Sequence, residues 1–501
     1  MLDYKLEKID HVNIKNSERL RFRSQFVLGP DYVNFLPHFW KKIKIDRNLF
    51  LTIHPDLNCS FMKSGNNSLI LIGHILDPDN PSHNNEDILS DLLFNSFDNF
   101  NTLIERTFTL GGRWILIVKL GEDIILFNDA SGLRQVFYTD INSTGSLWCA
   151  SQPGLIADIL GLAIDGEAHD FIKKIEPINK EYWWPGNSSP FKEIKHLLPN
   201  HYIHLNTGAV NRYWPNKKLN RLSLNMAVER ISRILKGLAC SMYNRFDLAL
   251  SITAGLDSRV VLASFKDFHK DITCITLKEQ GMSRWSADIR VPKTMLSALG
   301  VNHDIVNVSP TIDDIYSSIF KNNVAYAHDI WLKDAYAIFN YNRNEKVAVV
   351  GSVSEIGRCF YKSSRYSGGK LTGSILSSMT KMNGNHFAAT SFNKWLKSIE
   401  NLFDYNLLDL FYWEQRVGNW LAMCQLEFDL AWKDIFSPFN CRELIVSMLS
   451  VDEEFRSPPH YKLHKGLILN LWPELLVYPI NPPDRILLLK KKVSNLLWIR
   501  R

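Results

Sequence analysis

Hydrophobic positions change their spacing partway along the chain, near residue 215. Before that point, short β-branched or aromatic runs are separated by turn residues, as in RWILIVKL (113–120) and DIILFND (123–129). Runs of this kind predict strands. The segment HYIHLNTGAVNRYW (201–214) predicts a hairpin that turns at Asn-Thr-Gly. The first part of the chain is therefore expected to be rich in antiparallel strands.

After residue 215 the pattern becomes that of alternating strands and helices. Apolar residues recur at three- and four-residue steps from Leu222 to Met242, which predicts an amphipathic helix. Short apolar runs then alternate with helical stretches, which favours βα units around a parallel sheet. From about residue 375 onward the pattern is mainly helical. The four runs are DLALSIT (247–253), ITCITL (272–277), HDIVNV (303–308) and KVAVVGS (346–352).

Length and composition fit a two-domain globular protein. A chain of 501 residues is too long for one core. We place the boundary between a β-rich domain, residues 1–215, and a doubly wound α/β domain with additional helices, residues 216–501. Apolar residues make up 46% and charged residues 22%, and the net charge is only +6. This weak charge does not favour nucleic acid as a partner.

Neither a membrane nor an oxidising compartment is indicated. The first fifteen residues mix charges throughout, and no apolar run approaches the roughly 18 residues that a membrane span needs. Seven cysteines are scattered singly, without a CxxC pair. This usage is typical of reduced thiols, so we expect a cytoplasmic protein without a disulfide frame or a cysteine zinc site.

The most informative short segment is TAGLDS (253–258), which joins the first run of the α/β part to a helical pattern. A strand that ends in a small-residue turn and enters a helix presents backbone N–H groups that favour anions. Asp257 is a suitable ligand for Mg²⁺, and Ser258 can cap the helix or donate to an oxyanion. Neither GxxxxGK[ST] nor GxGxxG occurs in the chain. A simple strand-to-helix connection with an Asp/Ser cap stays open as the alternative.

Residues 253–258 resemble SGGxDS, the pyrophosphate-binding loop of the AMP-forming ATP pyrophosphatases, in the version found in asparagine synthetase and its relatives. Thr253 and Ala254 depart from the usual Ser and Gly. The following strands and SADIRVPK (286–293) are similar to the same family in the same order, over roughly residues 222–485. The resemblance implies an ATP site at Ser251, Thr253, Ala254, Gly255, Leu256, Asp257, Ser258, Leu277 and Gly351.

The same resemblance implies a second acidic residue at the metal. VAVVGSVSEIGR (347–358) is similar to the family's later strand and turn, whose acid holds Mg²⁺ together with the first-loop aspartate. That match assigns Glu355 and Asp257 as the metal ligands. Two carboxylates from adjacent loops suit a Mg²⁺–triphosphate complex. A solvated loop acid is the alternative for Glu355.

The first domain resembles the glutamine-hydrolysing Ntn domain of this family, through GGRWILIVKLGEDIILFNDASGLRQVFYT (111–139) and SPFKEIKHLLPNHYIHLNTGAVNRYWP (189–215). The family uses a cysteine that becomes the first residue after removal of Met. Here position 2 is Leu, and the nearest cysteine, Cys59, lies deep within the chain. Without that nucleophile no thioester forms, so we expect a retained scaffold rather than a glutaminase. β-Lactam synthetases and lasso-peptide cyclases share this loss.

The second chemical step needs a base and a cation. Glu414 and Glu427, on apolar-rich helical segments, are candidate bases whose pKa burial can raise toward neutrality. Lys490, in a run of three lysines, is the candidate cation for the oxyanion. A structural salt-bridged glutamate is the alternative for each acid, and a solvated basic run is the alternative for Lys490.

These features predict an ATP-dependent, AMP-forming amide ligase that uses ATP and Mg²⁺ and joins a carboxylate to an amine without hydrolysing glutamine. The product is a lactam, a macrolactam or an amide between two molecules, and contact with a precursor peptide or a partner enzyme stays open. A catalytically inactive scaffold with the same fold is the main alternative. A sulfur-inserting, tRNA-directed pyrophosphatase is a third, which the absent cysteine pairs and the weak charge disfavour.

Overall fold

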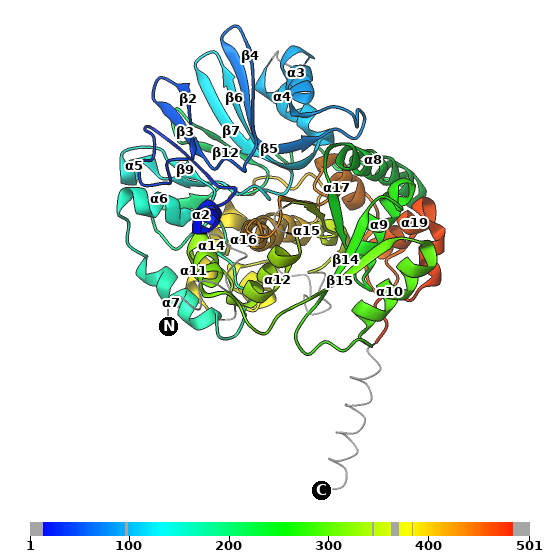
Figure 1. The fold of residues 1–501 in the computed structure, drawn as a ribbon. Coiled ribbons are helices and arrows are strands. Elements are labelled where there is room, and N and C mark those ends of the chain that lie inside the picture. The colour runs from blue at the N-terminus through cyan, green and yellow to red at the C-terminus, as the bar shows by residue number, and fades with distance from the viewer. Residues whose placement is uncertain (1–13, 96–98, 343–344, 362–369, 383, 484–501) are drawn as a thin grey trace, which may run out of the picture.

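The computed structural model describes residues 14–95, 99–342, 345–361, 370–382 and 384–483, and these contain three β-sheets (Figure 1). All strands of the first two sheets come from residues up to 212, and all strands of the third from residue 248 onward. The predicted change of character near residue 215 therefore coincides with a change of sheet. None of the helices in the described ranges combines the length and apolar character that a membrane crossing requires.

The first two sheets are six-stranded and antiparallel. The predicted hairpin is present, with Ile203 opposite Val210. The first sheet has the order β10-β8-β9-β1-β3-β2, from β1 (Phe26–Gly29), β2 (Lys41–Asp46), β3 (Leu49–Ile53), β8 (Phe137–Thr139), β9 (Cys149–Ala150) and β10 (Ile194–His196). The second has the order β12-β11-β7-β6-β5-β4, from β4 (Cys59–Ser64), β5 (Asn67–Leu76), β6 (Gly111–Leu120), β7 (Asp123–Asn128), β11 (His201–His204) and β12 (Val210–Arg212).

These two sheets pack face to face between outer helices. Leu28 and Leu51 of the first sheet share one apolar core with Ile70 and Ile117 of the second. Because successive side chains of a strand lie on opposite faces of the sheet, the remaining side chains of these strands face away from this core. There, α3 (Asn85–Asn95) and α4 (Phe100–Arg106) cover the second sheet, and α6 (Pro153–Leu160) covers the first. The β-rich part is thus a four-layer sandwich of helix, sheet, sheet and helix.

The third sheet is parallel and lies between helices on both faces. Its order is β15-β14-β13-β16-β17, from β13 (Leu248–Ser251), β14 (Thr273–Lys278), β15 (Asn302–Asn307), β16 (Val347–Val349) and β17 (Asp434–Phe436). On one face are α8 (Leu224–Arg245), α9 (Leu256–Ser264), α10 (Ala287–Leu299) and α19 (Lys462–Leu471), and on the other is α12 (Leu332–Asn342). Both faces of such a sheet must be covered because it is apolar on each side.

The helical part toward the C-terminus contains an irregularity. Within the mainly helical pattern expected after residue 375, one continuous helical stretch consists of α15 (Leu407–Phe411), a π-helical segment η5 (Tyr412–Leu421) and α16 (Ala422–Phe428). The other described helices are α2 (Ile14–Leu20), α5 (Ile141–Thr144), α7 (Gly166–Ile175), α11 (Asp314–Asn323), α13 (Gly373–Met379), α14 (His386–Lys397), α17 (Arg442–Leu449) and α18 (Glu453–Arg456). Short helical turns are η1 (Thr107–Thr109), η2 (Lys266–Phe268), η3 (Asp329–Trp331), η4 (Ser354–Arg358) and η6 (Pro473–Val477).

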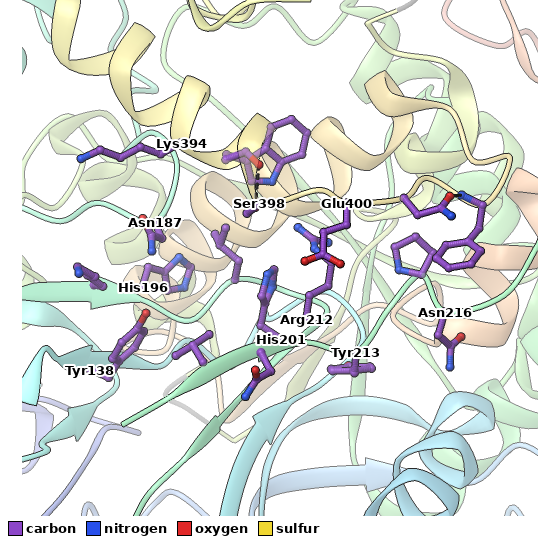
Figure 2. A pocket seen from close by; sticks show the side chains of 18 residues that line it. Tyr138, Asn187, His196, His201, Arg212, Tyr213, Asn216, Lys394, Ser398 and Glu400 are labelled. Carbon is purple, nitrogen blue, oxygen red and sulfur yellow. Dashed lines mark hydrogen bonds between the residues drawn. The ribbon is translucent and has the colours of Figure 1, made fainter. Parts of the chain in front are cut away.

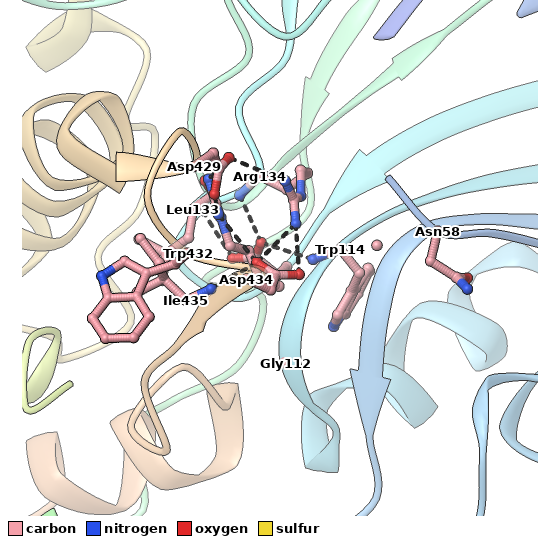
Figure 3. A network of polar contacts seen from close by, with 12 residues as sticks. Asn58, Gly112, Trp114, Leu133, Arg134, Asp429, Trp432, Asp434 and Ile435 are labelled. Carbon is pink, nitrogen blue, oxygen red and sulfur yellow. Dashed lines mark hydrogen bonds and ion pairs between the residues drawn. The ribbon is translucent and has the colours of Figure 1, made fainter. Parts of the chain in front are cut away.

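A buried ionic network ties the two parts of the chain together (Figure 3). Arg113 of β6 contacts Asp429 at 2.6 Å and Asp434 of β17 at 3.2 Å. Arg134 contacts the same two acids, at 3.5 and 2.9 Å. All four side chains are buried. Because each charge has partners of opposite sign, the network holds the sandwich to the parallel sheet without leaving a charge uncompensated.

Candidate active site

The TAGLDS segment forms the connection between β13 and α9, at the centre of the parallel sheet. Its hydroxyl groups bond one another: Thr253 Oγ1 lies 3.3 Å from Ser258 Oγ, which also accepts from the Thr253 backbone N–H. The Gly255 N–H donates to Thr253 Oγ1 at 3.1 Å. The loop therefore gathers two hydroxyls and several N–H groups at the N-terminus of α9, which is the arrangement that favours an anion.

Two further contacts fix the loop from outside. The Ala254 N–H donates to Asp288 Oδ1 of α10 at 2.9 Å, and the Asn481 N–H donates to the Ala254 carbonyl at 3.0 Å. Asp288 belongs to the SADIRVPK segment that the resemblance had singled out. The helix that follows β14 therefore braces the turn that follows β13.

Asp257 lies in the first turn of α9 and meets the loop that carries Glu355. Its carboxylate accepts hydrogen bonds from Ser354 Oγ and from Arg358 Nη1, the two residues that begin and end η4 around Glu355. The meeting follows from topology, since β13 and β16 are parallel neighbours whose C-terminal loops leave the same edge of the sheet. The structure thus brings Asp257 and the Glu355 loop together.

Gly351 allows these two loops to approach. A Cβ placed on Gly351 would lie 2.7 Å from the backbone nitrogen of Ser258 and 2.8 Å from the carbonyl carbon of Asp257. Both are main-chain atoms, which, unlike the end of a side chain, can move only if the loop moves. Only glycine fits at this position without moving the loop of Asp257.

The two acids perturb one another. Burial, together with the negative charge of Asp257, raises the pKa of Glu355 to about 7. A half-buried carboxyl with such a pKa is half protonated near neutrality, and a cation placed beside it would favour its charged form. Asp257 and Glu355 therefore have the chemistry of a divalent-ion site, with hard oxygen donors on separate loops.

Three residues to which the sequence pattern assigned no role lie around these acids. Arg358 pairs with Asp257, and its guanidinium carbon lies 4.7 Å from the ring centroid of Tyr461. His464 is buried, with its Nε2 3.8 Å from Asp257 Oδ1. Burial lowers the pKa of His464 to about 4, so its ring is neutral at pH 7. The arginine in SEIGR was the only sequence signal, because Tyr461 and His464 lie a hundred residues further along the chain.

Ser251 and Leu277 lie near the C-terminal ends of β13 and β14. Ser251 is opposite Ile275, and Leu277 packs against the small apolar cluster that contains Val306. Leu256 is buried at the start of α9. The residues that the resemblance assigns to ATP therefore line one edge of the parallel sheet.

Glu414 lies elsewhere and already has partners. Its carboxylate accepts hydrogen bonds from Arg212, Asn200 and Trp395, all outside the loops of Asp257 and Glu355. Burial alone would raise the pKa of Glu414, but the Arg212 charge outweighs it and the pKa is lowered. The expected rise toward neutrality is therefore wrong for this residue, and the salt-bridged alternative describes it.

Glu427 is also part of a buried pair. Its Oε1 accepts from the backbone N–H of His328 at 3.0 Å and contacts Nδ1 of the same residue at 2.8 Å. The other ring nitrogen of His328 faces the Tyr182 carbonyl at 2.7 Å. The Tyr182 carbonyl can only accept, so this ring nitrogen carries a proton, and the Glu427 carboxylate favours a proton on Nδ1 as well. Although burial alone would lower the pKa of His328, Glu427 raises it.

Cys424 lies beside this pair, and the three side chains together have the residue types of a metal site. Both nitrogens of His328 are engaged within the protein, Nε2 with the Tyr182 carbonyl and Nδ1 with Glu427, so neither is free to bind a metal ion. The cluster is therefore better described as a buried ion pair. Lys490, the candidate cation, lies outside the described residues.

In the described part of the chain, strand β1 is preceded by further residues, so the start of this strand carries no free α-amine of the kind that the glutamine-hydrolysing reaction uses. The chain continues before β1, and Arg23 and Gln25 are buried there. Arg23 contacts Asp56 at 3.0 Å and donates to the carbonyls of Asp429 and Trp432. Burial raises the pKa of Cys59 to about 11, so its thiol is protonated and poorly nucleophilic at neutral pH. All seven cysteines are free.

Comparisons with known proteins give only distant likenesses. No family model and no curated protein sequence matches the chain. Among solved structures, it is similar to NMN synthetase from Francisella tularensis, with 13% identity and a TM-score of 0.20 over 36% of this chain and 74% of that one. It is also similar to glutamine phosphoribosylpyrophosphate amidotransferase from B. subtilis, complexed with ADP and GMP, with 10% identity and a TM-score of 0.26 over 74% and 75%.

Proposed function

We propose that this chain is an ATP-dependent, AMP-forming amide ligase of the asparagine synthetase type that works without glutamine hydrolysis. The observation that carries the proposal is the convergence of Asp257 and the Glu355 loop beside a hydroxyl-lined helix N-terminus, at the C-terminal edge of a parallel sheet. Ligands of open α/β sheets bind at this edge. The sequence resemblance over residues 222–485 agrees with it.

The donor set fits Mg²⁺. Both candidate ligands are carboxylates, and they come from separate loops. The pKa of Glu355 is raised, and a nearby cation would lower it again. Mg²⁺ bound by Asp257 and Glu355 would neutralise charge on phosphate oxygens while pyrophosphate leaves. The residues of the chain itself supply the rest of the phosphate site.

In the first step, the substrate carboxylate attacks the α-phosphorus of ATP, and the bond to the β-phosphate oxygen breaks to release pyrophosphate. The hydroxyls of Thr253 and Ser258 and the N–H groups at the start of α9 hold phosphate oxygens whose charge increases. These donors are fixed before reaction by their contacts with one another and by Asp288. Fixed donors stabilise developing charge without reorganisation.

In the second step, an amine attacks the acyl carbon of the adenylate, the bond to AMP breaks, and the amine loses a proton. The proposed reaction needs no ammonia from glutamine. This agrees with a β1 strand that is preceded by buried chain rather than by a free amine, and with a protonated Cys59 thiol. The four-layer sandwich is then a scaffold for the ligase part.

A second candidate function is a non-catalytic binding protein of the same fold. The observation that favours it is Arg358, whose positive charge already neutralises Asp257. An arginine in that place can replace a metal ion structurally. The two candidates differ in whether a metal–nucleotide complex binds.

Calorimetric titration with a non-hydrolysable ATP analogue, with and without Mg²⁺, tests the proposal. We expect magnesium-dependent binding that Asp257→Asn and Glu355→Gln weaken at least about tenfold, the loss of one good charge interaction. Asp267→Asn, an exposed acid just beyond α9, is the control and binds like the parent chain. Absence of nucleotide binding by the parent chain contradicts the ligase and supports the scaffold.

Pyrophosphate release is the second measurement. With ATP, Mg²⁺ and a panel of carboxylates and amines, the enzyme releases pyrophosphate and AMP, and Asp257→Asn abolishes both. Glutamine does not replace the amine. Release of ADP and phosphate instead of AMP and pyrophosphate would show a different reaction class.

A further inference from the structure

A large cavity lies away from the loops of Asp257 and Glu355, where the edge strands of the two antiparallel sheets meet α14 and the loop after it (Figure 2). Its volume is about 840 Å³, within the range of small-molecule sites. In Figure 2, Tyr138, Asn187 and His196 lie on one side of it and Tyr213 and Asn216 on the other. No residue of the candidate ATP site lines it.

Two of the four charged side chains at the cavity wall are already paired. Arg212 is bound to Glu414, and Lys195 lies 3.4 Å from Asp140. Burial lowers the pKa of His196 and of His201 to about 4, so neither ring adds positive charge at neutral pH. Lys394 and Glu400 remain, and their charges have opposite signs. The cavity is therefore polar but close to neutral.

The uncharged groups at the wall can each give and receive hydrogen bonds. Asn187, Asn211, Asn216 and Asn401 are exposed there, and a side-chain amide has two N–H donors and a carbonyl acceptor. The Asn216 amide already donates once, to Glu105 at 3.4 Å, and the Asn401 carbonyl already accepts from the Phe403 N–H at 2.8 Å, so each keeps part of its capacity for a ligand. His196 also lines the wall, but it is almost fully buried. Its Nδ1 donates to Asn419 Oδ1 at 2.7 Å, because the Asn419 amide nitrogen is occupied with the Gly186 carbonyl. Its Nε2 is enclosed by protein atoms and has no hydrogen-bond partner among the described residues, so the amides are the groups that a ligand in the cavity would meet.

Aromatic rings form the apolar part of the wall. Tyr213 and Phe403 contribute partly exposed ring surface next to the amides, and Trp395, also at the wall, is almost fully buried. Faces of rings pack well against C–H groups, whereas the amides need partners that both donate and accept. An apolar ligand would leave the amides without partners, at a cost in free energy. An anion would find few uncompensated cations.

We propose that this cavity is a binding site for a neutral polyhydroxylated ligand, a mono- or oligosaccharide. Hydroxyl groups pair with the amides in both directions, and the C–H faces of a sugar ring lie against the aromatic side chains. The site is separate from the proposed ATP site and does not depend on it.

Saturation-transfer NMR and calorimetry with the full chain test this proposal. The probes are glucose, galactose, N-acetylglucosamine and maltotriose, each compared with glucuronate and galacturonate. We expect dissociation constants of about 0.1–10 mM for at least one neutral sugar, which corresponds to roughly 3–5 kcal/mol of binding. The acidic counterparts are expected to bind at least about fivefold more weakly.

Variants locate the site. Asn211→Trp, on β12, fills the cavity and is expected to abolish binding, while Asn187→Ala weakens it severalfold. Asn302→Trp changes another exposed strand asparagine, on β15, and is the matched control. Asp257→Asn leaves sugar binding unchanged, so this proposal and the ligase proposal fail separately. The inference is overturned if no neutral sugar of the panel binds, if a uronate binds more tightly, or if Asn211→Trp binds like the control.

Discussion

Glu355 and Asp257 share the positive charge of Arg358, and this makes their protonation depend on what else occupies the site. With Arg358 bound to Asp257, the pKa of Glu355 is raised to about 7 by burial and by the Asp257 charge. A metal ion must displace the proton of Glu355 before that carboxylate can bind it. Metal binding should then be coupled to proton release in the neutral range.

We predict that divalent-ion affinity of the nucleotide-free chain falls as pH decreases through 7. Above pH 7 Glu355 is ionised and ready to bind, whereas below it each further pH unit weakens binding by about tenfold. Mn²⁺ titrations followed by electron paramagnetic resonance at pH 6, 7 and 8 measure this. Glu355→Gln should bind weakly, with little pH dependence between 6 and 8. A parent chain with flat affinity over this range contradicts the prediction.

Arg358 should oppose the metal in the absence of nucleotide. Its guanidinium contacts the same carboxylate that the metal needs, and removing one positive charge within a few ångströms favours a cation. We predict that Arg358→Ala binds Mn²⁺ about tenfold more tightly than the parent chain, and Arg358→Lys similarly to it. Arg290→Ala, an exposed arginine on α10, is the control. Weaker binding by Arg358→Ala would mean that the arginine instead holds the loop in its binding shape.

At the scale of single residues, the acidic side chains of the site could be identified from the sequence more readily than the basic side chains that pair with them. Asp257 and Glu355 were identified because each follows a short apolar run in a recognisable motif. Arg358 was not, since nothing in the order of residues says that its side chain reaches back across to α9. Glu414 was misjudged for the same reason: apolar neighbours predicted burial correctly, but Arg212, two hundred residues earlier, sets its charge.

At the scale of elements, the site depends on the close approach of two loops. The loop after β13 and the loop after β16 meet at Gly351, where a methyl group would contact main-chain atoms of Asp257 and Ser258. The neighbouring strands fix both loop bases, so the added atom can be accommodated only by separating the loops or bending the sheet edge.

We predict that Gly351→Ala destabilises the fold by about 1–3 kcal/mol, as overpacking usually does. Because the displaced atoms belong to the nucleotide loop, it should also weaken binding of the ATP analogue by at least about tenfold. Chemical denaturation and calorimetry measure the two effects. Gly166→Ala is the control, since its Cβ would meet nothing within 4 Å and its backbone is not left-handed. Normal nucleotide binding by Gly351→Ala would show that the loops do not need to touch.

The elements themselves could be predicted in part. The four apolar runs after residue 245 correspond to β13, β14, β15 and β16, and the helix expected at 222–242 is α8. The fifth parallel strand, β17, was not predicted, because DIF is three residues long and follows a helical pattern. The π-helical segment η5 could not be predicted either, since its apolar pattern does not distinguish it from an α-helix.

On the scale of the whole molecule, the two parts of the chain behave as one packed body. The largest apolar core includes Trp183 and Trp214 from before residue 215 and Leu250 from the parallel sheet. Arg113 and Arg134 reach from the sandwich to Asp429 and Asp434. The sequence predicted two parts but not how they are joined, because these four residues are charged and resemble ordinary surface positions until the fold buries them.

A buried network of this kind predicts a large cost for removing one member. Arg113→Ala leaves Asp429 and Asp434 with Arg134 as their remaining arginine partner, in surroundings that do not solvate the excess charge. We expect a loss of about 3–5 kcal/mol in the free energy of unfolding, measured by urea denaturation. The double variant Arg113→Met, Asp429→Leu removes one charge of each sign and should recover much of that loss.

Matched measurements separate this effect from the general cost of losing an arginine. Arg233 pairs with Asp79 at 2.6 Å, but both side chains are more than half exposed. Arg233→Ala should change stability by less than about 1 kcal/mol, since water solvates the remaining charge. If the sandwich and the parallel sheet depend on one another through Arg113, circular dichroism and tryptophan fluorescence report a single shared transition in the parent chain. In Arg113→Ala that transition moves to lower urea. Separate transitions already in the parent chain would show that the two parts unfold independently and that the network does not join them.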